Sequence, residues 1–331
     1  MAQPKPRSII IDTDPGIDDA LAILYLLSCP EVSVKAITIA PGNHRDPAVL
    51  GANANLLLRL AGMEGQVPVG LSAVDEASHE PDEAQLKTVA MVHGEDGMGG
   101  VASKYGRSEA DRANFHALAA LDLIHKVCAD EPGKVSLVCI APLTNLAAAL
   151  RKHPELTSLV DEVVIMGGAL TEPRGNRLPA AEANFCDDPA AAQLVLTAGF
   201  AKVALADLGM THQTNIAHLQ QACARLNSVV ARFITEVSVC YIDCHLERFK
   251  KTYAPAHDIV AAIYFVHPDM FATQMVRVEV ETQGLLTSGM SIADWRGQWG
   301  RPANCAVMTS MHEPEAFAKV FLEGIAKLPR A

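Results

Sequence analysis

The chain has 331 residues, of which 50% are hydrophobic, and its formal net charge is −11 at pH 7. This length suits one large α/β domain or two ordinary ones. The acidic balance argues against broad binding to nucleic acid or to anionic membranes, because both need a basic patch.

Strand-like apolar runs alternate with helix-like patterns over most of the chain. Continuous apolar runs are typical of parallel strands that are covered on both faces. The alternation therefore predicts a single α/β domain over residues 1–331, with an open, mostly parallel β-sheet flanked by helices and a Rossmann-like core. The candidate strands are residues 8–11, 32–39, 67–69, 134–140, 162–166 and 203–206, and the candidate helices are residues 18–27, 47–61, 115–129, 143–152, 189–198 and 228–248.

One internal stretch and the last part of the chain depart from this alternation. The polar, Gly-rich residues 72–110 predict a long excursion from the sheet, and its centre, His93–Gly100, is typical of a mobile active-site loop. Residues 277–281 and 305–308 predict late strands that form an edge hairpin. Residues 314–328 predict a closing helix.

Eight cysteines are scattered along the chain, and none forms a C-x-x-C pair. Several lie in apolar runs, as buried free thiols do. This usage predicts a reducing compartment and a cytoplasmic location rather than a disulfide framework. The first residues lack the apolar core of a signal peptide, and no apolar stretch is long enough to cross a bilayer, so neither secretion nor membrane insertion is expected.

Four aspartates, Asp12, Asp14, Asp18 and Asp19, lie within eight residues near the start of the chain. They follow the first apolar run and precede an apolar helical pattern. Helix capping explains one or two of them, with Asp14 and Asp18 as the candidates. Carboxylates this close repel one another unless a hard cation such as Ca²⁺ or Mg²⁺ lies among them. The cluster therefore predicts a metal site, with one carboxylate left to act as a general base beside a metal-bound water.

Polar residues also follow the later candidate strands, where ligands bind in open α/β sheets. Each has a structural explanation by itself, as a turn residue, a helix cap or a surface histidine. Together they predict a site for a polar ligand with several hydroxyls, bound beside a metal. The residues after the strands are Asn43, Thr144, Asn145, Asn176, Glu182 and Asn184, and His257 and Asp258 open a later apolar helical run, residues 259–266.

The order of these motifs resembles the nucleoside hydrolase family, the inosine–uridine preferring type and its ribonucleoside hydrolase relatives. The resemblance is collinear over nearly the whole chain, which makes it far more specific than a single D-x-D-P-G motif. The matching blocks are residues 12–19, 42–43, 93–95, 142–145, 165–168, 179–184, 188–192, 257–258 and 281–284.

This resemblance implies a metal centre and a general base. Asp14, Asp19, Asp258 and the backbone carbonyl of Thr144 are expected to hold one calcium ion (Ca²⁺). Asp18 is expected to be the general base for a water bound to that ion. Ca²⁺ lowers the pKa of its bound water less than Zn²⁺ does, so an aspartate base is a sensible addition.

The resemblance also implies how the ribose is held. Asn43, together with the general base, is expected to bind the 2′- and 3′-hydroxyls. Asn176, Glu182 and Asn184 are expected to bind the 5′ side of the sugar, with Met166 packed beneath it. Carboxylate and amide oxygens in this place stabilise the positive charge that develops on the ribose as the N-glycosidic bond breaks.

On the side of the leaving base, the resemblance implies His257 as the proton donor and His93 as a lining residue. Tyr241 and His245, four residues apart on a predicted helix, either reach the base or are exposed helical residues. Residues 237–253 are expected to form one wall of the base pocket, although they do not align with the family pattern. The preference between purine and pyrimidine bases therefore stays open.

The expected function is Ca²⁺-dependent hydrolysis of ribonucleosides to ribose and a free base, by a homodimer or homotetramer active in salvage. A phosphotransferase of the haloacid dehalogenase class also begins with aspartates after the first strand, but the downstream lysine and acidic pair that it needs are missing. A non-catalytic nucleoside-binding protein, or a hydrolase of a modified nucleoside, remains an alternative. The presence of Asp18 argues against simple binding, which needs no base beside a metal.

Overall fold

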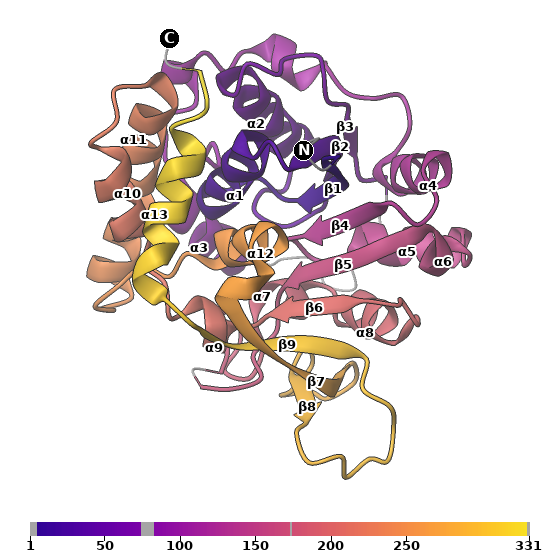
Figure 1. Cartoon of the computed structure of the whole chain (residues 1–331). Coiled ribbons are helices and arrows are strands. Elements are labelled where there is room, and N and C mark those ends of the chain that lie inside the picture. The colour runs from indigo at the N-terminus through magenta and orange to yellow at the C-terminus, as the bar shows by residue number, and fades with distance from the viewer. Residues whose placement is uncertain (1–4, 74–82, 173, 330–331) are drawn as a thin grey trace.

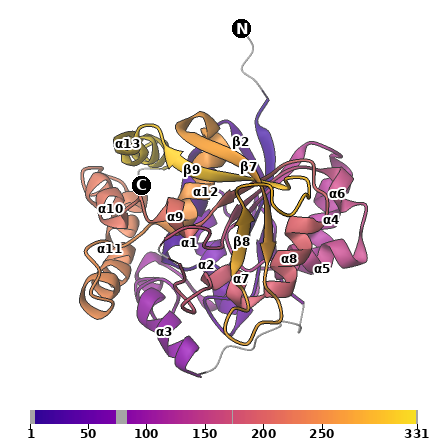
Figure 2. The ribbon, with the colours of Figure 1, turned by 90° about the horizontal axis from the view of Figure 1, so that it is seen from below.

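The protein forms one nine-stranded sheet covered by helices on both faces (Figures 1 and 2). The computed structural model describes residues 5–73, 83–172 and 174–329. The strand order is β3-β2-β1-β4-β5-β6-β9-β7-β8, and all neighbours up to the β6–β9 pair are parallel. The strands are β1 (Arg7–Thr13), β2 (Val32–Ile39), β3 (Val69–Leu71), β4 (Val135–Cys139), β5 (Val160–Met166), β6 (Val203–Ala206), β7 (Phe271–Val280), β8 (Ser291–Asp294) and β9 (Cys305–Met311).

Two hydrophobic cores lie on opposite faces of the sheet, and the strands contribute alternate residues to each. Ile9 and Ile11 of β1 belong to one core and Ile10 to the other, as the two-residue period of a strand requires. The first core contains α1 (Ile17–Ser28), α2 (Pro47–Leu60), α10 (Ile216–Cys223), α11 (Val229–Asp243), α12 (His257–Val266) and α13 (Pro314–Ile325). The second contains α4 (Ala120–Asp130), α5 (Thr144–Lys152), α6 (Leu156–Leu159) and α8 (Pro189–Thr197).

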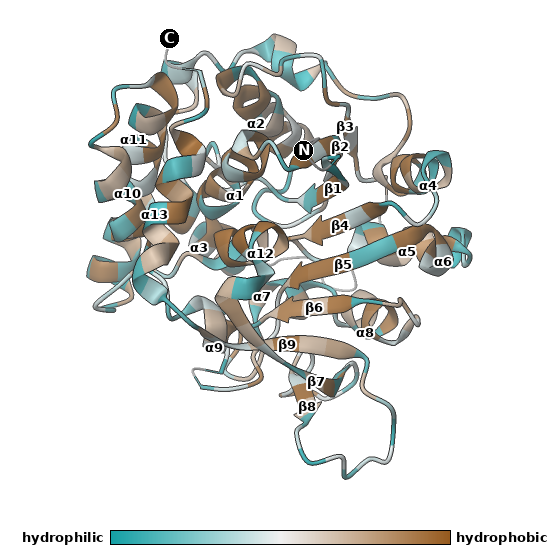
Figure 3. Ribbon diagram, in the orientation of Figure 1, coloured by the Kyte–Doolittle hydropathy of each residue, from teal (hydrophilic) through white to brown (hydrophobic). Residues whose placement is uncertain are grey.

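Burial on both faces explains why the central strands are largely apolar, and in Figure 3 β4 and β6 are mostly brown. The arrowheads of β1, β4, β5 and β6 point to the same side of the molecule in Figure 1. The carboxyl ends of these strands therefore form one edge, and the predicted α/β fold with a mostly parallel sheet is confirmed. Short helices α7 (Ala183–Asp187) and α9 (Leu208–Thr211) follow β5 and β6 at this edge.

Most predicted elements are present with shifted ends. The helix predicted from residue 115 begins at Ala120. The backbone N–H of His116 donates to the carbonyl of Val69 in β3, so this N–H is not available for a hydrogen bond within a helix. The helix predicted at residues 228–248 ends at Asp243 and continues as a π-helical turn, Cys244–Arg248. Ser228 is its N-cap, accepting from the backbone N–H of Ala231.

The predicted edge hairpin of two late strands is wrong. The strands do pair with each other in antiparallel fashion, but β9 lies inside the sheet, where it is also parallel to β6. The edge is formed by β8, which the sequence pattern did not indicate because it is only four residues long. A long chain segment thus returns to place β9 between β6 and β7.

The predicted excursion at residues 72–110 contains helix α3 (Glu83–His93), and its residues 74–82 lie outside the described part of the chain. The turn after α3 has a defined conformation. The Asp96 carboxylate accepts from the backbone N–H groups of Met98, Gly100 and Ala102. Among the described helices, none is both long and apolar enough to span a bilayer.

Candidate active site

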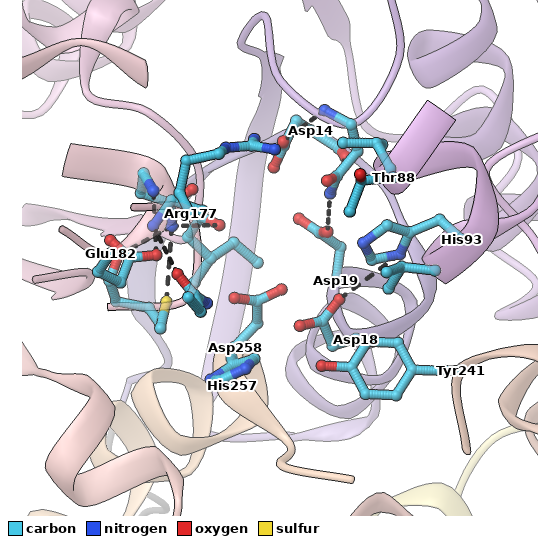
Figure 4. Close-up of a pocket in the computed structure, with 18 of the residues that line it drawn as sticks. Asp14, Asp18, Asp19, Thr88, His93, Arg177, Glu182, Tyr241, His257 and Asp258 are labelled. Carbon is cyan, nitrogen blue, oxygen red and sulfur yellow. Dashed lines mark hydrogen bonds and ion pairs between the residues drawn. The ribbon is translucent and has the colours of Figure 1, made fainter. Parts of the chain in front are cut away.

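A cavity of about 320 Å³ opens at the carboxyl ends of the parallel strands (Figure 4). Its size lies within the range of small-molecule sites. Thirteen of the fourteen residues predicted for the site line it; Thr144 does not. The lining residues that were predicted are Asp14, Asp18, Asp19, Asn43, His93, Met166, Asn176, Glu182, Asn184, Tyr241, His245, His257 and Asp258.

The turn between β1 and α1 positions the acidic residues. Asp19 Oδ2 accepts from the backbone N–H of Gly16 at 2.9 Å, and its Oδ1 accepts from the Thr13 hydroxyl at 2.5 Å. The capping role expected for Asp14 or Asp18 therefore belongs to Asp19. A carboxylate in the first turn is favoured there by the positive end of the helix dipole.

Asp14 and Asn43 join the ends of β1 and β2. Asp14 Oδ2 accepts from the backbone N–H of Asn43 at 2.8 Å, and the Asn43 side-chain amide donates to the Asp14 carbonyl and to Asp19 Oδ2. A Cβ atom at Gly42 would lie 1.9 Å from Asp14 Oδ2, so this approach requires glycine. Asn43 is thus a site residue as well as a turn residue.

Asp18, Asp19 and Asp258 bring one carboxylate oxygen each to within 4.8 Å of one another, and all three side chains are buried. Burial, followed by the charge of Asp19, raises the pKa of Asp18 to about 8. Burial and the charges of the three other aspartates raise the pKa of Asp258 well above its usual value. In the described part of the chain, no lysine or arginine is ion-paired with any of them. This oxygen-rich, uncompensated cluster fits a hard divalent cation.

Two predicted metal ligands are placed differently from expectation. Asp14 lines the cavity but stands outside the tight group of three, because its carboxylate is turned to the backbone of Asn43. Thr144 begins α5 below the cavity, and its hydroxyl donates to Asp188 Oδ2 at 2.7 Å. At the end of β4 it is Ile140 that lines the cavity, with its carbonyl 3.4 Å from Asn184 Nδ2.

Glu182 organises the wall opposite α1. It is the N-cap of α7, and its two carboxylate oxygens accept from the backbone N–H groups of Gly168, Asn184 and Phe185. Burial raises the pKa of Glu182 to about 7. The Asn184 amide donates to the Met166 carbonyl at 3.1 Å. Glu182, Asn184 and Met166 are therefore brought together as predicted.

Arg177 also lines this wall, although it was not predicted. Its guanidinium forms a two-point ion pair with Asp187, with Nε–Oδ1 and Nη2–Oδ2 distances of 3.0 and 2.6 Å. The two side chains are 12% and 18% exposed. This ion pair holds the segment that contains Asn176 and Arg177 against helix α7, which contains Asp187.

Replacing Arg177 with methionine is expected to lower the free energy of unfolding by about 3 kcal/mol, because the carboxylate of Asp187, with a side chain only 18% exposed, is left without a compensating charge. The double variant Arg177→Met/Asp187→Leu should recover most of the loss. Urea unfolding measures both, with Arg174→Met as the matched control, since Arg174 pairs with Glu172 on the surface. Equal stability of the Arg177 and Arg174 variants would contradict the assignment.

Aromatic and histidine rings form the remaining wall. Tyr241 and His245 are buried and stacked with ring centroids 4.3 Å apart, so the alternative that they are exposed helical residues is wrong. The π-helical turn that follows α11 carries His245, and such turns are frequent at functional sites. His93 Nδ1 accepts from the backbone N–H of Ile17 at 3.1 Å, which places its ring beside Tyr241.

His257 begins α12, next to Asp258, and its Nδ1 is 2.8 Å from the Thr211 hydroxyl. Burial lowers the pKa of His257 well below 6.5. A buried imidazole resists protonation, so burial favours the neutral ring, and the role of His257 as proton donor to the leaving base stays a prediction. Burial likewise lowers the pKa of His93 to about 3 and that of His245 to about 4.

Sequence reasoning missed several lining residues besides Arg177, among them Thr88, Phe249 and Lys251. Thr88 lies on α3, within the stretch that was expected to be an irregular excursion. Phe249 and Lys251 follow the π-helical turn, in the segment that was expected to form a wall of the base pocket but in which neither residue was singled out. The strict helical spacing assumed for residues 228–248 gave no signal for them.

Comparison with known proteins agrees with this geometry. The profile of the family described as "Inosine-uridine preferring nucleoside hydrolase" matches residues 9–318. The chain is 33% identical to the inosine-uridine preferring nucleoside hydrolase of Crithidia fasciculata over 327 residues, covering 98% of both chains. It is 34% identical to a pyrimidine-specific ribonucleoside hydrolase of Citrobacter koseri over 322 residues, covering 96% of this chain and 97% of the relative.

Solved structures show the same fold. A plant nucleoside hydrolase superposes with a TM-score of 0.85 at 30% identity, covering 97% of this chain and 99% of its own. A purine-preferring ribonucleoside hydrolase from Gardnerella vaginalis also has a TM-score of 0.85, at 28% identity and 97% and 98% coverage. With a family match over nearly its whole length and a buried acidic cluster where the family motifs converge, the chain belongs to the inosine-uridine preferring nucleoside hydrolase family.

Proposed function

We propose that this protein hydrolyses the N-glycosidic bond of ribonucleosides with the help of Ca²⁺, giving ribose and a free purine or pyrimidine base. The observation that carries the proposal is the buried group of Asp18, Asp19 and Asp258 at the base of a cavity of nucleoside size. Hydrolysis needs an activated water and a stabilised positive charge on the sugar, and carboxylates beside a cation supply both.

In this proposal Asp14, Asp19 and Asp258 hold the Ca²⁺ ion, and the carbonyl of Ile140 replaces that of Thr144 in the expected set. Carboxylate and carbonyl oxygens are the ligands that this ion prefers. When bound, the ion supplies positive charge to the cluster and lowers the pKa of water in its coordination shell.

Asp18 accepts the proton of the attacking water. Two sides of the cavity support binding of the ribose. Asn43, beside Asp14 and Asp19, faces its 2′- and 3′-hydroxyls together with Asp18, and Asn176, Glu182 and Asn184 on the opposite wall face its 5′ side. The Glu182 carboxylate, fixed by backbone N–H groups, stabilises the positive charge that develops on the ring.

The nucleobase lies against Tyr241 and His245, whose stacked rings offer an aromatic face for it. His257 Nδ1 lies 2.8 Å from the Thr211 hydroxyl, which fixes the orientation of the ring, and the tautomer with hydrogen on Nε2 would donate a hydrogen bond toward the base. His93 lines the same region, held by helix α1.

The test is release of reducing sugar from a panel of purine and pyrimidine ribonucleosides, before and after chelation of divalent metal. Ribose release that stops on chelation and returns with Ca²⁺ is the expected result, and the fastest substrate identifies the base preference. Nucleoside binding without ribose release would instead favour a non-catalytic binding protein or a modified substrate.

Three further proposals concern the location of the protein, its role and its oligomeric state. The eight cysteines are free thiols, which supports a reducing, cytoplasmic location. Membership of a nucleoside hydrolase family supports a role in nucleoside salvage. The family resemblance supports a homodimer or homotetramer, which sedimentation analysis of the full chain would distinguish from a monomer.

A further inference from the structure

Two histidines and a glutamate from different elements meet at the surface, and none of them lines the cavity. His125 lies on α4, His153 follows the last residue of α5, and Glu155 directly precedes α6. These three helices pack together on one side of the sheet (Figures 1 and 2). Each of the three residues offers one ligand atom, and these atoms lie within 4.8 Å of one another. Among the described residues, the only other such group is that of the cavity aspartates.

The distances between the three ligand atoms fit a single small cation. Glu155 Oε1 lies 3.1 Å from His125 Nε2 and 3.7 Å from His153 Nδ1. Two ligands of a tetrahedral zinc ion (Zn²⁺), each about 2.0–2.1 Å from the metal, are about 3.3–3.4 Å apart. The two measured separations lie on either side of this value. The three side chains are therefore already arranged around a position that one zinc ion could occupy.

The two imidazole rings are held side by side. The rings of His125 and His153 are stacked, with centroids 3.7 Å apart and planes 7° from parallel, and each presents a nitrogen to the same Glu155 oxygen. A metal ion lies near the plane of each imidazole that it binds, so binding would tilt the two rings apart. The side chains of the histidines are 27% and 22% exposed and that of Glu155 is 54% exposed, which leaves space for this tilt and for water as a fourth ligand.

A second carboxylate supports His153 at its other nitrogen. Asp122 Oδ1, on α4, lies 3.6 Å from His153 Nε2, the ring nitrogen that does not face Glu155. Histidines that bind a metal almost always direct their second nitrogen to such a carboxylate or to a carbonyl, which orients the ring. Asp122 also accepts from Lys152 Nζ at 2.6 Å, so the positive charge beside the group is compensated. The environment of His153 is thus that of a metal-binding histidine.

The backbone fixes the corner that carries two of the ligands. The N–H of His153 donates to the carbonyl of Ala149 at 2.7 Å, and Pro154 then prevents the helix from continuing. The carbonyl of Glu155 accepts from the N–H of Ser158 at 2.9 Å at the start of α6. His153 and Glu155 are therefore held two residues apart in a tight turn between two helices.

We propose that His125, His153 and Glu155 form a second metal site, which binds Zn²⁺ and joins α4 to the corner between α5 and α6. Two imidazoles and one carboxylate suit Zn²⁺ better than Ca²⁺, which prefers oxygen ligands. The site goes beyond the proposed function and does not depend on it. It lies at the far end of α5 from the cavity, and this nine-residue helix is about 14 Å long. The bound ion stabilises the folded state and takes no part in the reaction.

The test is Zn²⁺ binding to the full-length protein, first freed of metal by chelation and then saturated with Ca²⁺. Calorimetric titration should show that the wild type binds one equivalent of Zn²⁺ more than His125→Gln does. The thermal midpoint of the wild type should rise with Zn²⁺ but not with further Ca²⁺ or with Mg²⁺. His125→Gln and His153→Gln should each weaken Zn²⁺ binding by more than about 100-fold, and Asp122→Asn by about 10–100-fold, as outer-shell partners do.

His116→Gln is the matched control, because His116 is an exposed histidine just before α4 and lies outside the group of three. Co²⁺ in place of Zn²⁺ gives a second readout, since it absorbs visible light strongly in four-coordinate sites and weakly in six-coordinate ones. This absorption should disappear in His125→Gln and persist in His116→Gln.

No Zn²⁺ binding by the wild type, or binding that His125→Gln and His153→Gln leave unchanged, would overturn the site. Ribose release should be the same for His125→Gln and the wild type. A protein that releases no ribose but loses its Zn²⁺ site in His125→Gln would refute the proposed function and leave this assignment standing.

Discussion

Replacing Asp18 with asparagine is expected to lower kcat by about 10²–10⁴-fold, which is the usual contribution of a general base. Asparagine keeps the size of the side chain but does not take up a proton from water at neutral pH. Asp19 makes the capping-box hydrogen bond to Gly16, and asparagine keeps at position 18 a side-chain oxygen that can accept from the backbone N–H groups of the first turn, so the variant should fold normally. Initial rates of ribose release and the metal content of the purified variant are the measurements.

The metal content separates two roles for Asp18. In the proposed mechanism the variant keeps its Ca²⁺ and its KM and loses kcat, as expected when an interaction of the transition state is removed. Asp18 also belongs to the group of three close carboxylates, so loss of the ion would make it a ligand instead. Unchanged turnover with bound metal would rule out the base. Asp12→Asn is the control, because Asp12 is buried below the cavity and bonded to Thr38 and Asn145.

Replacing Asp258 with asparagine is expected to weaken Ca²⁺ binding by more than about 100-fold, since even outer-shell partners of a metal contribute about 10–100-fold. Turnover should fall with the metal occupancy and return in part at high Ca²⁺. Asp258 is a cleaner choice than Asp19, whose removal would also uncap helix α1. Calorimetric titration with Ca²⁺ measures the affinity. A variant that binds one equivalent of Ca²⁺ as completely as the wild type does would overturn the ligand assignment.

Stability gives an independent check of the same variant. Without metal, Asp258→Asn should raise the thermal midpoint, because the charge removed is buried and repelled by Asp14, Asp18 and Asp19. With Ca²⁺ at about 100 times its dissociation constant, the wild type should gain about 2.7 kcal/mol and the variant far less. Asp269→Asn is the matched control, an exposed aspartate in the turn after the same helix.

Local sequence patterns were sufficient for most of the parallel sheet. The apolar runs that became β1, β2, β4, β5 and β6 are buried on both faces, so their composition alone separates them from surface strands. The four-residue strand β8 and the insertion of β9 next to β6 were not predictable, because strand order depends on contacts between distant segments. Helix α3 was missed because its pattern is weak and only two of its residues are buried.

The acidic cluster could be predicted from the sequence for a different reason. Asp14, Asp18 and Asp19 lie on one turn between a strand and a helix, so their proximity follows from spacing along the chain. Asp258 joins them from a helix more than two hundred residues away, and only its match to a family motif suggested this. The sequence did not identify the residue at the end of β4 that reaches the cavity. Thr144, whose hydroxyl donates to Asp188, does not line the cavity, whereas Ile140 does.

By itself, the sequence determined the class of fold, the acidic turn after β1 and the family, because each depends on residues that are near in the chain or on motifs in a fixed order. Tertiary structure alone decided which side chains share the cavity wall. The π-helical turn rotates His245 inward, and the left-handed residue Lys250 returns Lys251 to the base side. Burial also lowers the pKa of His93 and of His245, since withdrawal from water disfavours the protonated ring.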